Sequence, residues 1–321
     1  MMDFFKNMNL LPKNFIVANI VDTLKDDPET GAEKVFEMAD KFIKDESTLA
    51  ILDQVKDVYY TRPAIRMYCK NLIYNTSKTC LNHFVQNIVV KALLEGLPKR
   101  EQLSEKHGVK IPHGLVLNLD NLAEVNRLVE QAKELGIHVI ILTQDQESLI
   151  KVYEKHLDMQ FFVITDSVSL TPKRCERLAN IGNVVPVIQY IEGGPSLSHL
   201  KASGLLYGLV THTHLENFQH ITSDGFVLPC IRQGSRFHWY MTSTLESSDS
   251  QSVLQFKNRI DYIRQMRPYL TLHIETNQQL SEGNISGNFV VEEVVHQTKQ
   301  RIVLPEVNAK NSQGKRLIQL F

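Results

Sequence analysis

Two histidines and a set of acidic residues are the side chains in this sequence best suited to chemistry. His212 and His214 lie two positions apart at the end of a strand-like run, so in a regular strand both imidazoles point to the same face. A His-x-His pair at the carboxyl end of a strand is a plausible metal-ligand pair, and Asp145 follows an earlier apolar run in the same way. Other acidic residues end neighbouring runs: Asp120, Asp166, Glu192 and Glu275. Three or four of these side chains brought together would form a metal site or a general acid–base site. The simpler interpretation is that polar residues at strand ends cap turns and helix starts, and the sequence leaves both open.

The remaining reactive residue types do not form a known catalytic pattern. The four cysteines are scattered, with no Cys-x-x-Cys and no Cys/His pair at zinc spacing: Cys69, Cys80, Cys175 and Cys230. We therefore expect buried thiols. Gly193 and Gly194 form a turn without the glycine spacing and lysine of a phosphate-binding loop, and no serine nucleophile motif is present. The sequence predicts no catalytic residue of a standard type.

Composition narrows the class of protein. The 321 residues are 43% hydrophobic and 22% charged, which is ordinary for a soluble globular chain. Lys plus Arg (35) nearly balances Asp plus Glu (36), which argues against nucleic acid as the main partner. No run approaches the roughly 18 apolar residues of a membrane span, and the first residues lack the pattern of a secretory signal. These features predict a cytoplasmic protein without a transmembrane segment.

The first third of the chain is expected to be helical. Residues 28–43 place apolar side chains at three- and four-residue steps, and residues 48–60 and 61–74 continue this pattern, with Pro63 suited to a first helical turn. Residues 83–97 form another apolar helix, which Gly96 and Pro98 are expected to stop. We expect a helical N-terminal domain over residues 1–110.

The pattern of apolar residues changes at about residue 111, where short apolar runs begin to alternate with helical patterns. Strands are predicted over residues 114–120, 138–143, 160–165, 184–191, 204–214, 236–241 and 269–275. Helices are predicted over residues 121–136, 147–156, 171–181 and 250–267. Continuous apolar strands separated by helices are typical of a parallel sheet covered by helices. About seven such strands predict a partial α/β barrel.

Several stretches resemble radical S-adenosylmethionine (radical SAM) proteins. Residues 94–112 are similar to the segment that leads into the barrel of that family, and residues 133–136 and 152–156 are similar to its first two barrel helices. Residues 178–186 and 216–227 continue the similarity, which covers roughly residues 85 to 275. The resemblance implies a partial (βα)6-type radical-SAM-like barrel over residues 111–280, followed by a C-terminal extension over residues 281–321.

The functional motifs of that family are missing. Asp120 meets Asn121 directly where the family carries a Cys-x3-Cys-x2-Cys loop, and an iron–sulfur cluster needs such thiolates. Residues 143–147 lack the Gly-Gly-Glu-Pro turn that holds the SAM amine there. Glu192 and Gly193 remain as residual SAM-site positions, but the segment after them is shortened. The resemblance thus implies a degenerate barrel without the cluster and without SAM.

These observations favour a non-catalytic pseudoenzyme that acts by binding, as an accessory or regulatory subunit of another protein. The expected partner is a protein, either a true radical SAM relative or a second copy of this chain. Two alternatives remain open. One is a repurposed enzyme with a metal or acid–base site at the barrel mouth, built from His212, His214, Asp145 and Glu192; the other is a sensor of SAM or a nucleoside.

Overall fold

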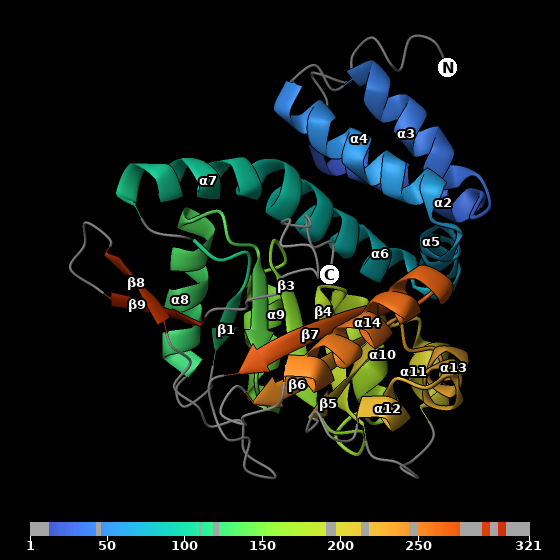
Figure 1. The fold of residues 1–321 in the computed structure, drawn as a ribbon. Helices are drawn as coiled ribbons and strands as arrows, with labels where there is room; N and C mark the ends of the chain where they lie inside the picture. The colour runs from blue at the N-terminus through green and yellow to red at the C-terminus, as the bar shows by residue number, and fades with distance from the viewer. Residues whose placement is uncertain are drawn as a thin grey trace.

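The computed structural model describes most of the chain, namely residues 13–42, 46–108, 111–117, 122–190, 197–212, 218–243, 250–276, 291–295 and 301–305. The first part is helical, as predicted (Figure 1). Its elements are α2 (Lys13–Asp26), α3 (Gly31–Phe42), α4 (Glu46–Thr61), α5 (Pro63–Asn75), α6 (Lys78–Phe84), the π-helical η2 (Val85–Glu95) and α7 (Gly96–His107). Pro63 occupies the start of α5, where its missing N–H leaves no helical hydrogen bond unmade.

The predicted helix stop at Gly96 and Pro98 is wrong. Helices α6, η2 and α7 follow one another without a break, and η2 is π-helical. Pro98 lies in the first turn of α7, where a proline is tolerated because no helical hydrogen bond requires its N–H. Gly96 is instead required for packing, because a Cβ at this position would lie 2.3 Å from the carbonyl oxygen of Gly136. The glycine lets the helix approach the backbone at the end of α8.

A sheet of seven parallel strands forms the centre of the molecule. Its strands are β1 (Leu115–Leu117), β2 (Val139–Leu142), β3 (Gln160–Thr165), β4 (Val184–Gln189), β5 (Gly208–His212), β6 (Phe237–Ser243) and β7 (Leu270–Thr276). They pair in sequence order, and each pair is parallel. The described helices that follow β1 to β6 make six βα steps, and β7 adds a last strand.

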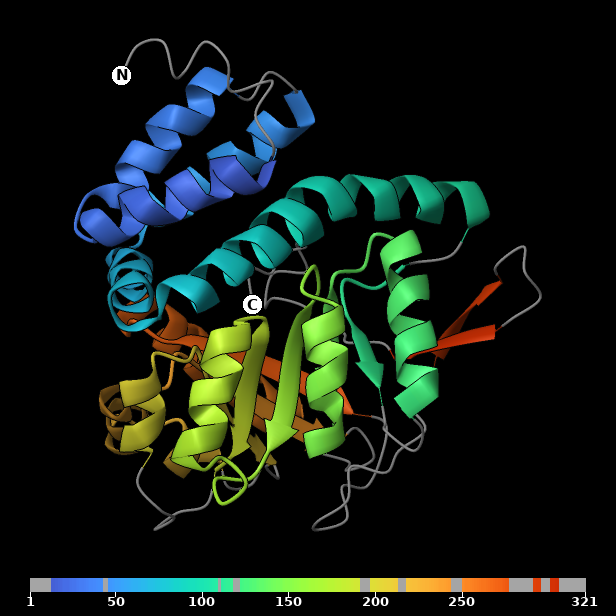
Figure 2. The same cartoon turned by 180° about the vertical axis from the view of Figure 1, so that it is seen from behind.

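Helices cover the outer face of the curled sheet (Figure 2). They are α8 (Leu122–Glu134), η3 (Glu147–Leu149), α9 (Ile150–Lys155), α10 (Pro172–Ile181), α11 (Ser198–Ser203), α12 (Phe218–Ile221), α13 (Asp224–Gln233) and α14 (Ser250–Met266). Thr171 caps α10 by accepting a hydrogen bond from the Arg174 amide at 3.3 Å, which explains where this helix begins. The sequence did not predict α12 and α13.

The two faces of the sheet pack against different parts of the chain. Side chains alternate along each strand, so Phe161 and Val163 of β3 pack beneath the outer helices. Phe162 of the same strand faces inward and packs with Leu72 of α5 and Ile88 of η2. The N-terminal helices therefore complete the inner core of the sheet.

The sheet is open within the described residues. β1 and β7 stand at its two ends and do not pair with each other, which confirms the predicted α/β partial barrel with a helical N-terminal region. An antiparallel pair, β8 (Val291–Val295) and β9 (Arg301–Pro305), lies within the expected C-terminal extension, with β9 next to β1.

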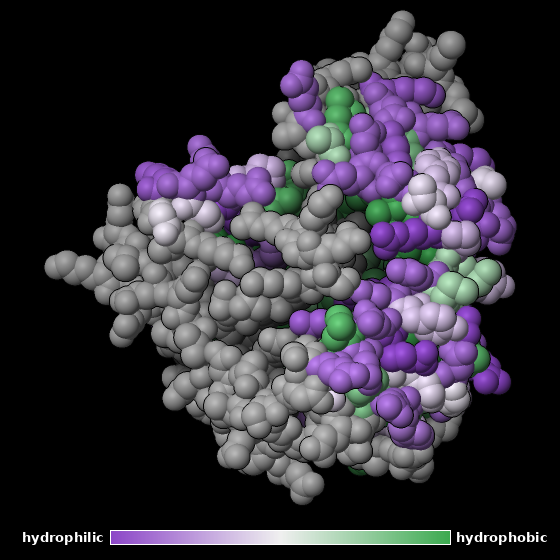
Figure 3. Space-filling model, viewed as in Figure 1, coloured by the Kyte–Doolittle hydropathy of each residue, from purple (hydrophilic) through white to green (hydrophobic). Residues whose placement is uncertain are grey.

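The described surface on one side of the molecule is mainly hydrophilic, with small and separate hydrophobic areas over the N-terminal helices and α14 (Figure 3). None of the helices in the described ranges has the length and apolar character needed to cross a membrane.

Candidate functional site

The carboxyl ends of parallel strands meet at one edge of the sheet, and this carboxyl edge is where the sequence placed its candidate site. Barrel proteins build their binding and catalytic sites at this edge, from side chains that follow the strands. Asp145 follows β2 and His212 ends β5. Glu192, Gly193 and His214, like Asp120, lie outside the described residues, so these predictions stay predictions.

Asp145 is engaged by neighbours within the protein. Its Oδ1 accepts a hydrogen bond from the Arg174 guanidinium at 2.7 Å, and its Oδ2 accepts one from the Thr165 hydroxyl at 3.2 Å. The side chains are largely buried, with 7% of Asp145 and 15% of Arg174 exposed. Burial raises the pKa of Asp145 above its ordinary value, and the Arg174 charge opposes this shift. The pair joins the end of β2 to α10.

Ion pairs extend from Arg174 to the surface. Glu147 contacts the guanidinium groups of both Arg174 and Arg177 at 3.0 Å, and Arg177 also reaches Glu154 at 3.4 Å. The Tyr153 hydroxyl is buried and has no hydrogen-bond partner in the described part of the chain. Because the oxygens of Asp145 already accept two hydrogen bonds, this arrangement is better suited to holding η3, α9 and α10 together than to binding a metal ion.

His212 lies apart from Asp145. Its side chain is on the same, inner face of β5 as that of Val210. Partial loss of solvent around the ring lowers the pKa of His212, although the residue remains exposed. Three strand spacings of about 4.8 Å separate β2 from β5, so the two residues are about 14 Å apart along the sheet. Across the described ranges, no three His, Cys, Asp or Glu side chains are placed to hold a metal ion.

Asp166 caps a turn, which is the role that the simpler interpretation of the sequence assigned to the strand-end acidic residues. Its carboxylate accepts hydrogen bonds from the Ser169 amide at 2.7 Å and the Ser169 hydroxyl at 2.8 Å. Burial raises its pKa, but these hydrogen bonds outweigh that effect and leave the pKa below its ordinary value. Asp166 therefore stabilises the turn after β3.

The cysteines confirm the expectation of buried thiols for three of the four positions. Cys80, Cys175 and Cys230 are buried, Cys69 is half-buried, and all four are free. Burial raises the pKa of Cys69 and Cys175 to about 11 and that of Cys230 to about 12. At neutral pH these side chains are therefore thiols in the metal-free protein.

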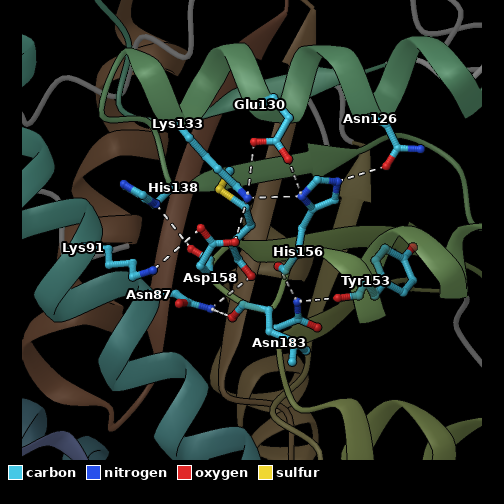
Figure 4. Close-up of polar contacts among 12 residues, drawn as sticks. Asn87, Lys91, Asn126, Glu130, Lys133, His138, Tyr153, His156, Asp158 and Asn183 are labelled. Carbon is cyan, nitrogen blue, oxygen red and sulfur yellow. Dashed lines mark hydrogen bonds and ion pairs between the residues drawn. The ribbon is translucent and has the colours of Figure 1, made fainter. Parts of the chain in front are cut away.

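A polar network at the opposite, amino edge of the sheet was not predicted from the sequence (Figure 4). His156, which follows α9, is fully buried, with its Nε2 2.9 Å from Asn126 Oδ1 and its Nδ1 3.2 Å from the Lys133 ammonium. Burial and the Lys133 charge lower the pKa of His156. The ring is therefore neutral, donating from Nε2 to Asn126 and accepting at Nδ1 from Lys133.

Two carboxylate contacts extend this network. Lys133 binds the Asp158 carboxylate at 2.8 Å, and Lys91 of η2 lies 3.7 Å from the same group. Burial raises the pKa of Asp158, but the hydrogen bond and charge of Lys133 outweigh it and leave the pKa below its ordinary value. The network thus links η2, α8 and the turn before β3.

Two buried asparagines complete the amino edge. Asn183 donates to the carbonyl oxygens of Tyr153 at 3.1 Å and His156 at 2.9 Å, and Asn87 donates to those of Leu157 and Met159, both at 3.0 Å. They satisfy backbone carbonyls at the end of α9 and in the turn before β3. A single polar residue at the end of a helix or strand does not form a periodic pattern, so the sequence did not predict the roles of Asn87 and Asn183.

Comparison with known proteins adds similarity of fold only. No known family model matches this chain, and no curated protein sequence does. Among solved structures, SuiB of Streptococcus suis superposes with a TM-score of 0.42 at 13% identity, covering 65% of each chain. Its complex with S-adenosylmethionine gives a TM-score of 0.41 at 14% identity, covering 65% of this chain and 64% of SuiB. The 3-dehydroquinate dehydratase of Geobacillus kaustophilus gives 0.39 at 10% identity, covering 51% of this chain and 74% of the dehydratase. The fold assignment itself rests on the order and direction of the strands.

Proposed function

We propose that this protein is a non-catalytic, radical-SAM-like scaffold that acts by binding another protein, as an accessory or regulatory subunit. The observation that carries the proposal is the short connection between β1 and α8. β1 ends at Leu117 and α8 begins at Leu122, so only residues 118–121 join them. Four residues without a cysteine have no room for the Cys-x3-Cys-x2-Cys loop.

The described side chains support the loss of both cofactors. The cysteines are distributed over four helices, α5, α6, α10 and α13, rather than gathered at the carboxyl edge. After β2, where the SAM amine would be held in a radical SAM protein, Asp145 binds Arg174 and Thr165 instead. Neither the cluster nor SAM is part of the proposed function.

A barrel that does not carry out radical SAM chemistry can still act by binding another molecule. We propose a protein partner, either a true radical SAM relative or a second copy of this chain. Light scattering on the purified protein distinguishes the two: a second copy doubles the mass of about 36.8 kDa, whereas a heterologous partner leaves the isolated chain monomeric.

Anaerobic reconstitution with iron and sulfide is the decisive test. We expect no charge-transfer absorption of an iron–sulfur cluster and no iron retained after gel filtration. A variant with all four cysteines replaced by serine is the matched control, because adventitious iron binds equally to both proteins. Absorption in the parent that disappears in the variant would overturn the proposal.

A metal-dependent activity at the barrel mouth is the second candidate. The observation in its favour is His212, whose lowered pKa keeps a neutral imidazole exposed at the carboxyl edge. Metal analysis of the purified protein tests it. One equivalent of a metal that is lost in His212→Ala and kept in His220→Ala, an exposed histidine on α12, would favour this candidate over the scaffold.

A sensor of SAM or a nucleoside is tested by calorimetry. Heat of binding at a single site for SAM or its demethylated product would favour the sensor, and absence of heat with both would eliminate it.

A further inference from the structure

An open cavity of about 560 Å³ lies away from the carboxyl edge, between helix α11 and the turn that joins α5 to α6. The Ser77 amide donates to the carbonyl oxygen of Gly204 at 2.7 Å, which holds the two segments together. Gly204 has a φ of 72°, and a Cβ there would lie 3.0 Å from the Ser77 Cβ. Glycine therefore satisfies both the backbone conformation and the close approach at this junction. The volume is within the range of small-molecule sites.

The side chains around the cavity give it a positive charge. Lys201 of α11 lines it, is exposed, and makes no ion pair with a described acidic residue. Lys25 lies beneath the turn and donates to the carbonyl oxygens of Ile73 (2.7 Å) and Thr76. The Lys78 ammonium pairs with Asp22, and no Asp or Glu is among the described residues that line the cavity. An anionic ligand would meet one unpaired ammonium group and no opposing carboxylate.

One hydroxyl group supplies a further hydrogen-bond donor. The Ser77 hydroxyl is not that donor, because it accepts a hydrogen bond from the Cys80 amide at 3.2 Å and also contacts the Cys80 thiol. Thr76 lines the cavity although only 2% of the residue is exposed, and its hydroxyl has no hydrogen-bond partner among the described residues. This hydroxyl is not one of the fully buried unpaired polar atoms of the described residues, so it is open to the cavity. It is therefore available to donate to a ligand that enters the cavity.

An aromatic ring stands at the rim. Tyr74 lines the cavity and is 75% exposed, so its ring is open to contact by a ligand. Asn75 lies beside it, and its side-chain nitrogen donates to the carbonyl oxygen of Asn71 at 2.8 Å. A flat ligand ring could stack on Tyr74 while an anionic group reaches Lys201.

We propose that this cavity binds a small phosphate monoester that carries a planar ring. The Lys201 ammonium and the Thr76 hydroxyl hold the phosphate oxygens, which are acceptors only, and Tyr74 stacks on the ring. The site does not depend on the barrel mouth or on the proposed function above. In a regulatory subunit it would serve as an effector site.

Calorimetry on the full chain at low ionic strength tests the proposal with three probes: phenyl phosphate, inorganic phosphate and phenol. We expect single-site binding of phenyl phosphate, weaker binding of inorganic phosphate and none of phenol. Lys201→Ala should weaken phenyl phosphate binding about tenfold, the effect of losing one hydrogen bond to a charged group. Tyr74→Ala should reduce the affinity for phenyl phosphate to that for inorganic phosphate.

Lys151→Ala is the matched control, because Lys151 is an exposed lysine on α9 outside the cavity. It should bind phenyl phosphate like the parent. The proposal is overturned if phenyl phosphate does not saturate a single site, if Lys151→Ala weakens binding as much as Lys201→Ala does, or if phenol binds as tightly as phenyl phosphate. Circular dichroism of each variant confirms that the comparison is between folded proteins.

Discussion

The amino and carboxyl edges of the sheet carry polar side chains of different kinds. At the amino edge, fully buried His156 and Asn183 bind neighbouring side chains and backbone carbonyls (Figure 4). At the carboxyl edge, Asp145 and Arg174 form a largely buried pair that continues into exposed ion pairs. The amino edge resembles a core with its polar groups satisfied, whereas the carboxyl edge resembles a surface.

The similarity to radical SAM proteins is divided in the same way. Lys133, His156 and Asn183 all lie in stretches that resemble that family, and all belong to the amino-edge network. The positions where the family motifs are expected to be missing are residues 118–121, 143–147 and 194–200, which follow β1, β2 and β4 along the chain. In barrels the amino edge serves stability and the carboxyl edge serves chemistry. The two sets of residues do not overlap, which is consistent with the proposed function of a barrel scaffold without radical SAM chemistry.

The largest expected effect is at Asn183. Asn183→Leu removes the donor to two buried carbonyl oxygens, and we expect the free energy of unfolding to fall by about 3 kcal/mol. Urea denaturation measures it. Thr165→Val, which removes one hydrogen bond to Asp145 at the carboxyl edge, is the comparison. If Thr165→Val were the more destabilising, the division between the two edges would be wrong.

Asp145→Ala should have the next largest effect, about 2 kcal/mol. It leaves the mostly buried Arg174 without its nearest carboxylate, but Glu147 still contacts the guanidinium and limits the loss. The double variant with Arg174→Met removes the stranded charge and should recover part of the stability. No recovery in a thermal or urea denaturation series would mean that Asp145 stabilises the protein by another route.

The pH dependence of stability should distinguish His156 at the amino edge from His212 at the carboxyl edge. The pKa of His156 in the folded state is below its ordinary value of 6.5, so the unfolded state takes up the proton first. His156 therefore costs no stability above about pH 6.5, and the protein loses stability as the pH falls from there towards the folded-state pKa, by at most about 1.4 kcal/mol per pH unit.

His156→Gln should flatten this pH dependence, whereas His212→Gln at the carboxyl edge should change it less because the residue is exposed. Urea denaturation at about pH 7.5 and about pH 5.5 provides the measurement. Equal flattening by the two substitutions would remove the distinction between a buried amino-edge histidine and an exposed carboxyl-edge histidine.

The smallest effect is expected at Arg177. The Arg177 side chain is half exposed, and the side chains of its partners Glu147 and Glu154 are exposed to a similar or greater extent. Arg177→Ala should therefore change the free energy of unfolding by less than about 0.5 kcal/mol. A loss above about 1 kcal/mol in the same denaturation assay would show that the carboxyl-edge ion pairs are more than a surface feature.

Much of the fold was predictable because its signals are local. Apolar runs and helical periods predicted a strand at residues 160–165 and helices over residues 171–181 and 250–267, each within one residue of the observed β3, α10 and α14. The stop at Gly96 was wrong because the role of this glycine is set by Gly136, forty residues away. Helices α12 and α13 were missed; Pro229 inside α13 obscured its pattern.

The candidate site was less predictable because it depends on distances between strands. The sequence correctly identified Asp145 and His212 as strand-end residues. It did not predict that Arg174 binds Asp145, or that β3 and β4 separate the strands of the two residues. The cavity at Thr76 and Lys201 had no sequence signal, because its residues come from helices more than a hundred positions apart.

The sequence by itself determined the order of helices and strands, the parallel class of the sheet and the absence of cysteines between β1 and α8. These follow from residue type, period and spacing along the chain. Only the tertiary structure decided which polar groups are satisfied and which remain available to a ligand. Hydrogen bonds and ion pairs form between segments that meet only after folding, so the state of Asp145, His156 and Thr76 depends on the folded neighbours of each residue.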